Sequence, residues 1–217
     1  MPTPLVNRLL WVLMLGTLAA LAYTFDVSVY MGSGKLTVTT DPSDQRAVVL
    51  KWRGEIAPPM RAKIEEAFRE HRSKADRFVL SLSSPGGSVG HGGAVIRLLR
   101  EIRRTHRLET VLEGNATCAS MCVPIYLQGE VRRATGRSHW MFHEVSLRDA
   151  VTHEKEDMRP SDQKARTDRL FDDYFRPAGV PDRWIEGMRE QMKGGHDVWR
   201  TGEQLLRERS GIIQEQL

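Results

Sequence analysis

Four short segments of the sequence contain residue types that can carry out acyl transfer. They occur in the order Gly86-Gly87, Ser120, His143 and Asp197. An acyl-transfer site needs backbone N–H donors for an oxyanion, a nucleophile, a base beside it and a carboxylate that orients the base. The order and the residue types therefore predict a serine-type site, although each segment taken alone has a simpler explanation.

The glycine segment, residues 83–89 (SSPGGSV), lies between a predicted strand and a predicted helix. Adjacent glycines allow a positive φ and a close approach of the backbone to a ligand, and N–H groups at a helix start can hold a negative charge. Taken alone, such a segment is ordinarily a tight turn. It does not fit a P-loop, because no Gly-Lys-Ser/Thr follows, and it does not fit a dinucleotide fingerprint.

Ser120 lies between Cys118 and Cys122, just before an apolar stretch. A serine at a helix start is ordinarily an N-cap, but small neighbours would let its hydroxyl face a cleft. If residues 118–126 are helical, the two cysteine Cβ atoms lie about 5–6 Å apart, which exceeds the usual disulfide range. A disulfide would need a non-helical start at Cys118, and the sequence leaves that question open.

The histidine and the aspartate are ambiguous by themselves. His143 follows a predicted strand, at a position where loops carry function, but His139 is nearby and equally titratable. Asp197 precedes a short strand, and Thr201 is expected to begin the next helix as its N-cap. Spacing alone does not assign a role to either side chain.

The elements that must position these residues alternate along the chain. We expect strands near 36–40, 47–52, 77–82, 108–112 and 138–142, helices from Pro58 and at 92–105, 118–126, 161–175 and 181–192, and a β-α-β piece at 197–213. Strands that alternate with helices of this length predict an α/β fold with a mainly parallel sheet.

The N-terminal residues 9–25 form an uncharged stretch of 17 residues, preceded by Arg8 and followed by no Lys or Arg until Lys35. As a helix it would be about 25 Å long. Three interpretations compete: a signal anchor, a signal peptide cleaved near residues 20–22 (ALA), or a buried core helix. Each of the first two exports the rest of the chain, which for a bacterial protein means the periplasm.

Composition bounds the remaining possibilities. The chain has 217 residues, a net charge of +4 and two cysteines. Two cysteines exclude a disulfide-rich scaffold and a four-cysteine zinc site, and the charge is too small to indicate nucleic-acid binding. An arginine-rich stretch at 97–107 is expected to be a solvated helix face, with contact to anionic phospholipid as the second interpretation.

On these residues the chain resembles the proteolytic subunit of Clp protease, within the Clp/crotonase superfamily, and especially membrane-anchored or periplasmic Clp-like serine proteases of bacteria. Residues 84–89 (SPGGSV) match the family's glycine loop, 119–121 (ASM) its nucleophile motif, and 141–144 (MFHE) the stretch that contains the catalytic histidine. Residues 197–201 (DVWRT) resemble the segment that supplies the acid.

The resemblance implies a βαβ superhelical fold and a serine peptidase that needs no metal or organic cofactor. It implies the following roles: Ser120 as nucleophile, His143 as base, Asp197 as acid, the N–H groups of Gly87 and Met121 as the oxyanion hole, and Pro85, Gly86 and Ser88 as the supporting loop. Cys118 and Cys122 are a possible redox pair. The expected partners are a peptide or protein substrate, a membrane through residues 9–25 and further copies of the chain, but no nucleic acid.

Several departures from the family keep alternatives open. Asp172, Asp173 and Asp182 compete with Asp197 for the role of the acid. A serine–lysine dyad, as in related membrane proteases, is disfavoured because no lysine occurs between Lys74 and Lys155. The rival functions are a catalytically inactive Clp-like module that binds peptides or partners, and a crotonase-type acyl-thioester enzyme that uses coenzyme A. We expect three parts: residues 1–25 as anchor or signal peptide, 26–45 as linker and 46–217 as the catalytic domain.

Overall fold

The computed structural model describes residues 34–148 and 155–217. The expected membrane segment, residues 9–25, lies outside these ranges. Within the described ranges, no helix has both the length and the apolar character needed to cross a membrane.

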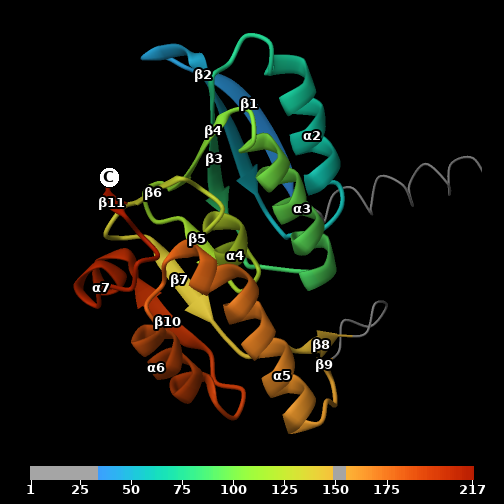
Figure 1. The fold of residues 1–217 in the computed structure, drawn as a ribbon, viewed down its shortest axis with the longest axis vertical. Coiled ribbons are helices and arrows are strands. Elements are labelled where there is room, and N and C mark those ends of the chain that lie inside the picture. Colours follow the sequence, from blue (N-terminus) through green and yellow to red (C-terminus); the bar gives the residue numbers. More distant parts are fainter. Residues whose placement is uncertain (1–33, 149–154) are drawn as a thin grey trace, which may run out of the picture.

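The described chain is an α/β structure built around two sheets (Figure 1). The strands are β1 (Lys35–Asp41), β2 (Asp44–Arg53), β3 (Arg77–Ser83), β4 (Arg107–Leu112), β5 (Thr117–Ala119), β6 (Val131–Ala134), β7 (His139–Phe142), β8 (Leu147–Arg148), β9 (Lys155–Glu156), β10 (Val198–Thr201) and β11 (Glu215–Gln216). The helices are α2 (Met60–His71), α3 (Val89–Ile102), α4 (Cys122–Tyr126), α5 (Pro160–Leu170), α6 (Asp182–Met192) and α7 (Gly202–Arg207), with a π-helical turn at Phe171–Phe175 and a 3₁₀ turn at Arg176–Ala178.

The larger sheet has six strands in the order β1-β2-β3-β4-β6-β11. Only the β1–β2 pair is antiparallel, and the pairs from β2 to β11 are parallel. Helices α2 and α3 lie together against one face of this sheet (Figure 1). The expected α/β class with a mainly parallel sheet is therefore confirmed.

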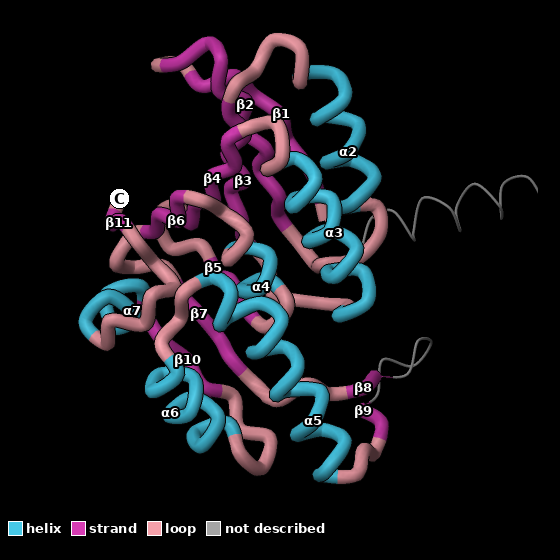
Figure 2. The backbone as a smooth tube through the Cα atoms, viewed as in Figure 1, coloured by secondary structure: helices cyan, strands magenta, loops and turns pink. Residues whose placement is uncertain are grey.

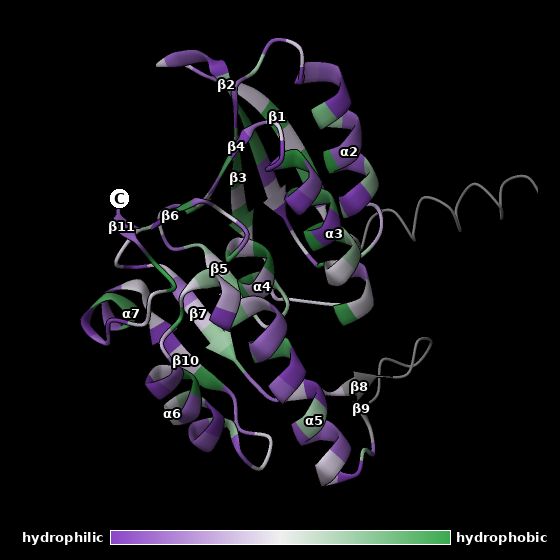
Figure 3. Cartoon of the chain, viewed as in Figure 1, coloured by the Kyte–Doolittle hydropathy of each residue, from purple (hydrophilic) through white to green (hydrophobic). Residues whose placement is uncertain are grey.

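The smaller sheet has the order β10-β7-β5, with β5 parallel and β10 antiparallel to the central β7. Helices α5, α6 and α7 gather around it, while α2 and α3 flank the larger sheet (Figure 2). Apolar residues line the strands and the inner sides of the helices, and polar residues the outer sides (Figure 3). One continuous core joins the two parts, including Trp52, Phe78, Tyr126 and Trp140, all fully buried.

One carboxylate on the larger sheet is completely buried. Glu109 on β4 has 0% exposure. Its carboxylate forms ion pairs with Arg77 on β3 at 3.3 Å, with Arg107 at 3.0 Å and with Arg133 on β6. A buried charge is tolerated only when it is paired and hydrogen-bonded, so these three guanidinium groups stabilise the carboxylate and link three parallel strands.

Several element boundaries differ from the sequence-based expectations. The strand expected near 36–40 within the linker is the edge strand β1, residues 35–41, and β2 begins at Asp44, earlier than the expected strand 47–52. Helix α3 starts at Val89 rather than residue 92, because the Ser88 side chain caps it by accepting from the His91 N–H at 3.1 Å. The final strand is β11 at Glu215–Gln216, which pairs with β6 and lies beyond the β-α-β piece expected at 197–213. The expected helix 161–175 ends in a π-helical turn.

Candidate active site

The glycine loop lies between two neighbouring segments that hydrogen-bond to it. On one side, the Ala119 N–H donates to the Ser84 carbonyl at 3.0 Å, which connects the loop to strand β5. On the other side, the Ile56 N–H donates to the Gly86 carbonyl at 2.7 Å, and the Ser88 N–H donates to the Ile56 carbonyl at 2.9 Å. The loop is therefore held in place beside the residue that follows β5, which is Ser120.

The two central glycines are required by conformation and by space. Gly86 has φ +99° and Gly87 has φ +147°, in a region that residues with a side chain rarely adopt. A Cβ on Gly86 would lie 2.7 Å from the Ser120 Cβ, and one on Gly87 would lie 2.5 Å from the Ile56 carbonyl oxygen. The backbone of the loop thus approaches Ser120 more closely than any side chain would allow.

Ser120 occupies a sharp turn between β5 and α4. Its φ of +52° is left-handed, which is uncommon for a serine and costs free energy that the surrounding structure must supply. Its N–H donates to the Met141 carbonyl on β7 at 2.9 Å. The N-cap interpretation is not what the structure has, because Met121 is the N-cap residue of α4 and the Ser120 hydroxyl bonds elsewhere.

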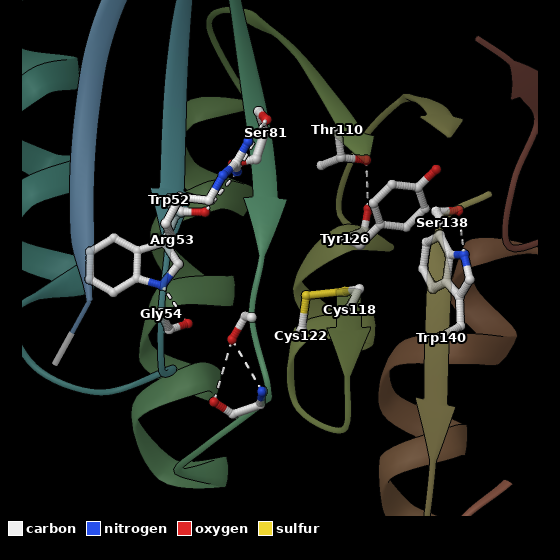
Figure 4. The surroundings of a disulfide bond; sticks show 12 residues. Trp52, Arg53, Gly54, Ser81, Thr110, Cys118, Cys122, Tyr126, Ser138 and Trp140 are labelled. Carbon is white, nitrogen blue, oxygen red and sulfur yellow. Dashed lines mark hydrogen bonds between the residues drawn. A yellow bond between two sulfur atoms is a disulfide. The ribbon is translucent and has the colours of Figure 1, made fainter. Parts of the chain in front are cut away.

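The two cysteines on either side of Ser120 form a disulfide (Figure 4). The prediction of one helix over 118–126 is wrong: Cys118 belongs to strand β5, and the helix begins at Cys122. Because the chain turns between them, the Cα atoms lie 5.2 Å apart, within the range of a disulfide. Both cysteines are fully buried, and Cys118 pairs in register with Trp140 of β7.

His143 contacts the Ser120 hydroxyl directly. Its Nε2 lies 2.7 Å from the Ser120 Oγ, and its Nδ1 lies 2.6 Å from the backbone carbonyl oxygen of Glu144. A carbonyl oxygen can only accept, so in this arrangement Nδ1 carries the proton and Nε2 is free to accept from the serine hydroxyl. This is the tautomer that a general base needs.

Two backbone N–H groups beside this pair have no hydrogen-bond acceptor. Within residues 34–148 and 155–217, neither the Gly87 N–H nor the Met121 N–H donates to another protein group. The Met121 side chain is buried against Gly92 of α3, where an added Cβ would lie 2.4 Å from the Met121 Cγ. Groups of this kind can donate to an oxyanion that forms on a substrate bound at Ser120.

Within the described residues, Asp197 makes no hydrogen bond to His143. Val198 pairs with Phe142 in the β10–β7 register, so Asp197 and His143 each lie one residue beyond a paired position on neighbouring strands. The Asp197 side chain is exposed, however, and within the described ranges it has no hydrogen bond to the imidazole. The competing Asp172 and Asp182 both pair with Arg176 instead.

Sequence reasoning missed several groups at this site. The carbonyl of Glu144 that bonds His143 is a backbone group, so no residue type indicates it. The Glu144 carboxylate accepts from the Gly195 N–H at 3.0 Å and thereby connects the segment before Asp197 to the histidine segment. Trp199 pairs with Met141 in register and is 52% exposed, which is unusual for a tryptophan.

His91, in the first turn of α3, is a further titratable group close to the glycine loop. Its Nε2 is buried and has no partner within the described ranges. Desolvation, and secondarily the positive charge of Arg61, lowers the pKa of His91 from its ordinary value of 6.5. We found no group of three or more His, Cys, Asp or Glu side chains arranged to hold a metal ion within the described ranges.

Comparison with known proteins identifies the fold. No protein-family model matches the chain, and no curated protein matches it. Among solved structures, it is similar to an asparagine-to-aspartate mutant of ClpP1 from Listeria monocytogenes, with a TM-score of 0.58 and 17% sequence identity. The match covers 79% of this chain and 91% of the ClpP1 chain. The fold is therefore Clp protease-like, as the resemblance in the sequence implied.

Proposed function

We propose that the chain is a serine peptidase that hydrolyses peptide bonds, with Ser120 as nucleophile and His143 as general base. One observation carries the proposal: the 2.7 Å contact between the Ser120 Oγ and the His143 Nε2, in an imidazole whose other nitrogen is bonded to a carbonyl oxygen. A nucleophile and a base in direct contact, with the base oriented by a third group, are the parts that acyl transfer needs.

The proposed reaction uses few groups. The Ser120 hydroxyl attacks the substrate carbonyl while His143 takes its proton, and the imidazolium then gives a proton to the leaving amine. The Gly87 and Met121 N–H groups stabilise the tetrahedral oxyanion, where one such donor is typically worth about 2.7–4 kcal/mol of transition-state stabilisation. In the proposal Asp197, the residue before β10, acts as a negative charge that favours the imidazolium.

The test is covalent labelling of the purified chain with a fluorophosphonate, which reacts with an activated serine. We expect stoichiometric labelling of the wild type at Ser120, none in Ser120→Ala, and a rate lower by about 10²–10⁴-fold in His143→Ala. His139→Ala is the matched control, since His139 begins β7, four residues before His143, and is exposed. The proposal fails if the folded wild type is neither labelled nor able to cleave a peptide library.

A second function has one observation in its favour. Asp197 is exposed and has no hydrogen bond to His143, which is compatible with a Clp-like module that binds peptides without cleaving them. The same labelling experiment separates the two functions. An inactive module would bind peptides with equal affinity in the wild type and in Ser120→Ala, and neither protein would be labelled.

We also propose that the domain is exported and attached to a bacterial inner membrane through residues 9–25. The buried Cys118–Cys122 disulfide supports this location, because disulfides persist in oxidising compartments such as the periplasm. Protease added to spheroplasts should digest the domain while leaving a cytoplasmic marker intact. Resistance of the domain in intact spheroplasts, followed by digestion after lysis, would contradict export. The expected homo-oligomer stays a prediction.

A further inference from the structure

The disulfide forms a small ring around the proposed catalytic groups. It joins the middle residue of β5, Cys118, to the first residue of α4, Cys122. The chain that it closes contains Ser120 at its centre and Met121 next to it. The proposed nucleophile and one of the two proposed oxyanion donors therefore both lie inside the ring.

Cys118 and Ala119 are held by their pairing with β7, and the Ala119 N–H also donates to the Ser84 carbonyl at 3.0 Å, whereas the turn at Ser120 and Met121 has fewer backbone contacts. The Ser120 N–H donates to Met141, and the Ser120 carbonyl accepts from the Val123 N–H at 3.0 Å. The left-handed φ of Ser120 is unfavourable for a residue with a side chain, so an unrestrained turn would relax toward a more common conformation. Such a relaxation rotates the Ser120 side chain relative to His143 and redirects the Met121 N–H.

Both ends of the ring are fixed by the core, the first through strand pairing and the second through helix packing. Cys118 is paired with Trp140 of the smaller sheet, whereas α4 is buried along its whole length and packs through Tyr126 against the Trp140 ring at a centroid distance of 4.8 Å. Figure 4 shows the disulfide joining the strand of Cys118 to the helix of Cys122, near Tyr126 and Trp140. The covalent bond thus restricts the conformations of the turn between the two rigid elements.

We infer that the Cys118–Cys122 disulfide is a positioning element of the active site, so that Ser120 reaches full reactivity only after the two thiols have been oxidised. The inference rests on the proposed function. It adds a condition to that function: the same chain would be weakly active in a reducing compartment and fully active in an oxidising one.

The oxidation has a defined balance. Two thiols lose two protons and two electrons as the sulfur–sulfur bond forms. The acceptor is a second disulfide, on a protein oxidant or a small molecule, which is reduced to two thiols by thiol–disulfide exchange. Because both sulfur-bearing residues are fully buried, exchange requires either an opening of the turn or a bond formed during folding.

The experiment compares labelling kinetics in variants of the full chain. Saturation kinetics with a fluorophosphonate separate the maximal labelling rate from the concentration needed for half of it. In Cys118→Ala/Cys122→Ala we expect a maximal rate lower by about tenfold to 100-fold with the half-saturating concentration within about twofold, because the misplaced nucleophile is the defect. Circular dichroism must show that the variant is folded.

Val123→Ala is the matched control. Val123 is also fully buried and directly follows the ring, but it lies outside it. This variant should lose stability and keep the labelling rate within about twofold. A folded double-cysteine variant that is labelled at the wild-type rate would overturn the inference, and so would an equal loss of rate in Val123→Ala.

A second measurement uses the native cysteines. Wild-type chain refolded with dithiothreitol, which donates two electrons and two protons and closes to its own cyclic disulfide, should be labelled slowly. Oxidised glutathione should then restore both the rate and the absence of free thiols. Equal rates in the oxidised and reduced wild type would refute the inference and leave the proposed function intact. Failure of the oxidised wild type to be labelled would instead refute the proposed function.

Discussion

At the scale of single residues, the orientation of His143 depends on a backbone group rather than on a carboxylate. The Glu144 carbonyl oxygen lies 2.6 Å from Nδ1, so the neighbouring peptide selects the tautomer that leaves Nε2 free for Ser120. In a triad that relies on an aspartate for this selection, replacing the aspartate by asparagine costs about 10⁴-fold, because the wrong tautomer results. The structure predicts a different outcome for this chain.

Replacing Asp197 by asparagine should therefore have a small effect. We expect the fluorophosphonate labelling rate of Asp197→Asn to stay within about tenfold of the wild type, since the carbonyl still fixes the tautomer and only a stabilising charge is lost. Labelling rates of both proteins at one pH measure the effect. A loss as large as that of His143→Ala would show that Asp197 is the orienting group after all.

At the scale of elements, patterns that repeat along the chain could be predicted, and local backbone geometry could not. The apolar periodicity and the turn residues predicted strands at 77–82 and 138–142, and the structure has β3 and β7 there. Residues 118–126 misled the prediction, because their apolar composition is equally compatible with a buried strand, a turn and a short helix. The switch at Ser120 depends on contacts with β7 that come from 21 residues further along the chain.

The glycine loop and the turn of Ser120 act as one unit, which Gly86→Ala should disrupt. The added methyl group would lie 2.7 Å from the Ser120 Cβ, so we expect labelling to be lost. Gly179→Ala is the control, because Gly179 also has a positive φ, +83°, but has no atom within 4 Å of the added Cβ. The control should lose about 1–2 kcal/mol of stability from the backbone conformation and keep its labelling rate. Equal labelling of both variants would contradict the proposed contact.

At the scale of the whole molecule, the two sheets share a single core, so a local change in protonation is measured as a change in global unfolding. The α/β class of the fold was predictable from the sequence, because the alternation of strands and helices determines it. The six-strand order was not, because the pairing of β11 with β6 joins segments about 80 residues apart through a strand of only two residues.

Stability should fall as the pH drops, in part because of His91. Desolvation lowers the pKa of this imidazole below 6.5 in the folded chain, so the unfolded chain binds a proton first as the pH falls. The loss of folding free energy that His91 causes is absent above about pH 7 and grows as the pH falls below about 6.5. Urea unfolding between pH 7 and pH 5 should show a steeper loss in the wild type than in His91→Gln. Parallel curves would show that His91 is solvated in the folded state.

The exposure of Trp199 makes its intrinsic fluorescence sensitive to what lies beside it. Of the tryptophans in the described ranges, Trp52 and Trp140 are fully shielded from solvent, Trp184 is 8% exposed and Trp199 is 52% exposed. Among these four tryptophans, a quencher dissolved in water therefore reaches mainly Trp199, which pairs in register with Met141, whose carbonyl accepts from the Ser120 N–H. We expect the fluorescence emission of Trp199 to change when a peptide binds beside Ser120. Binding at the site could therefore be followed without attaching a dye.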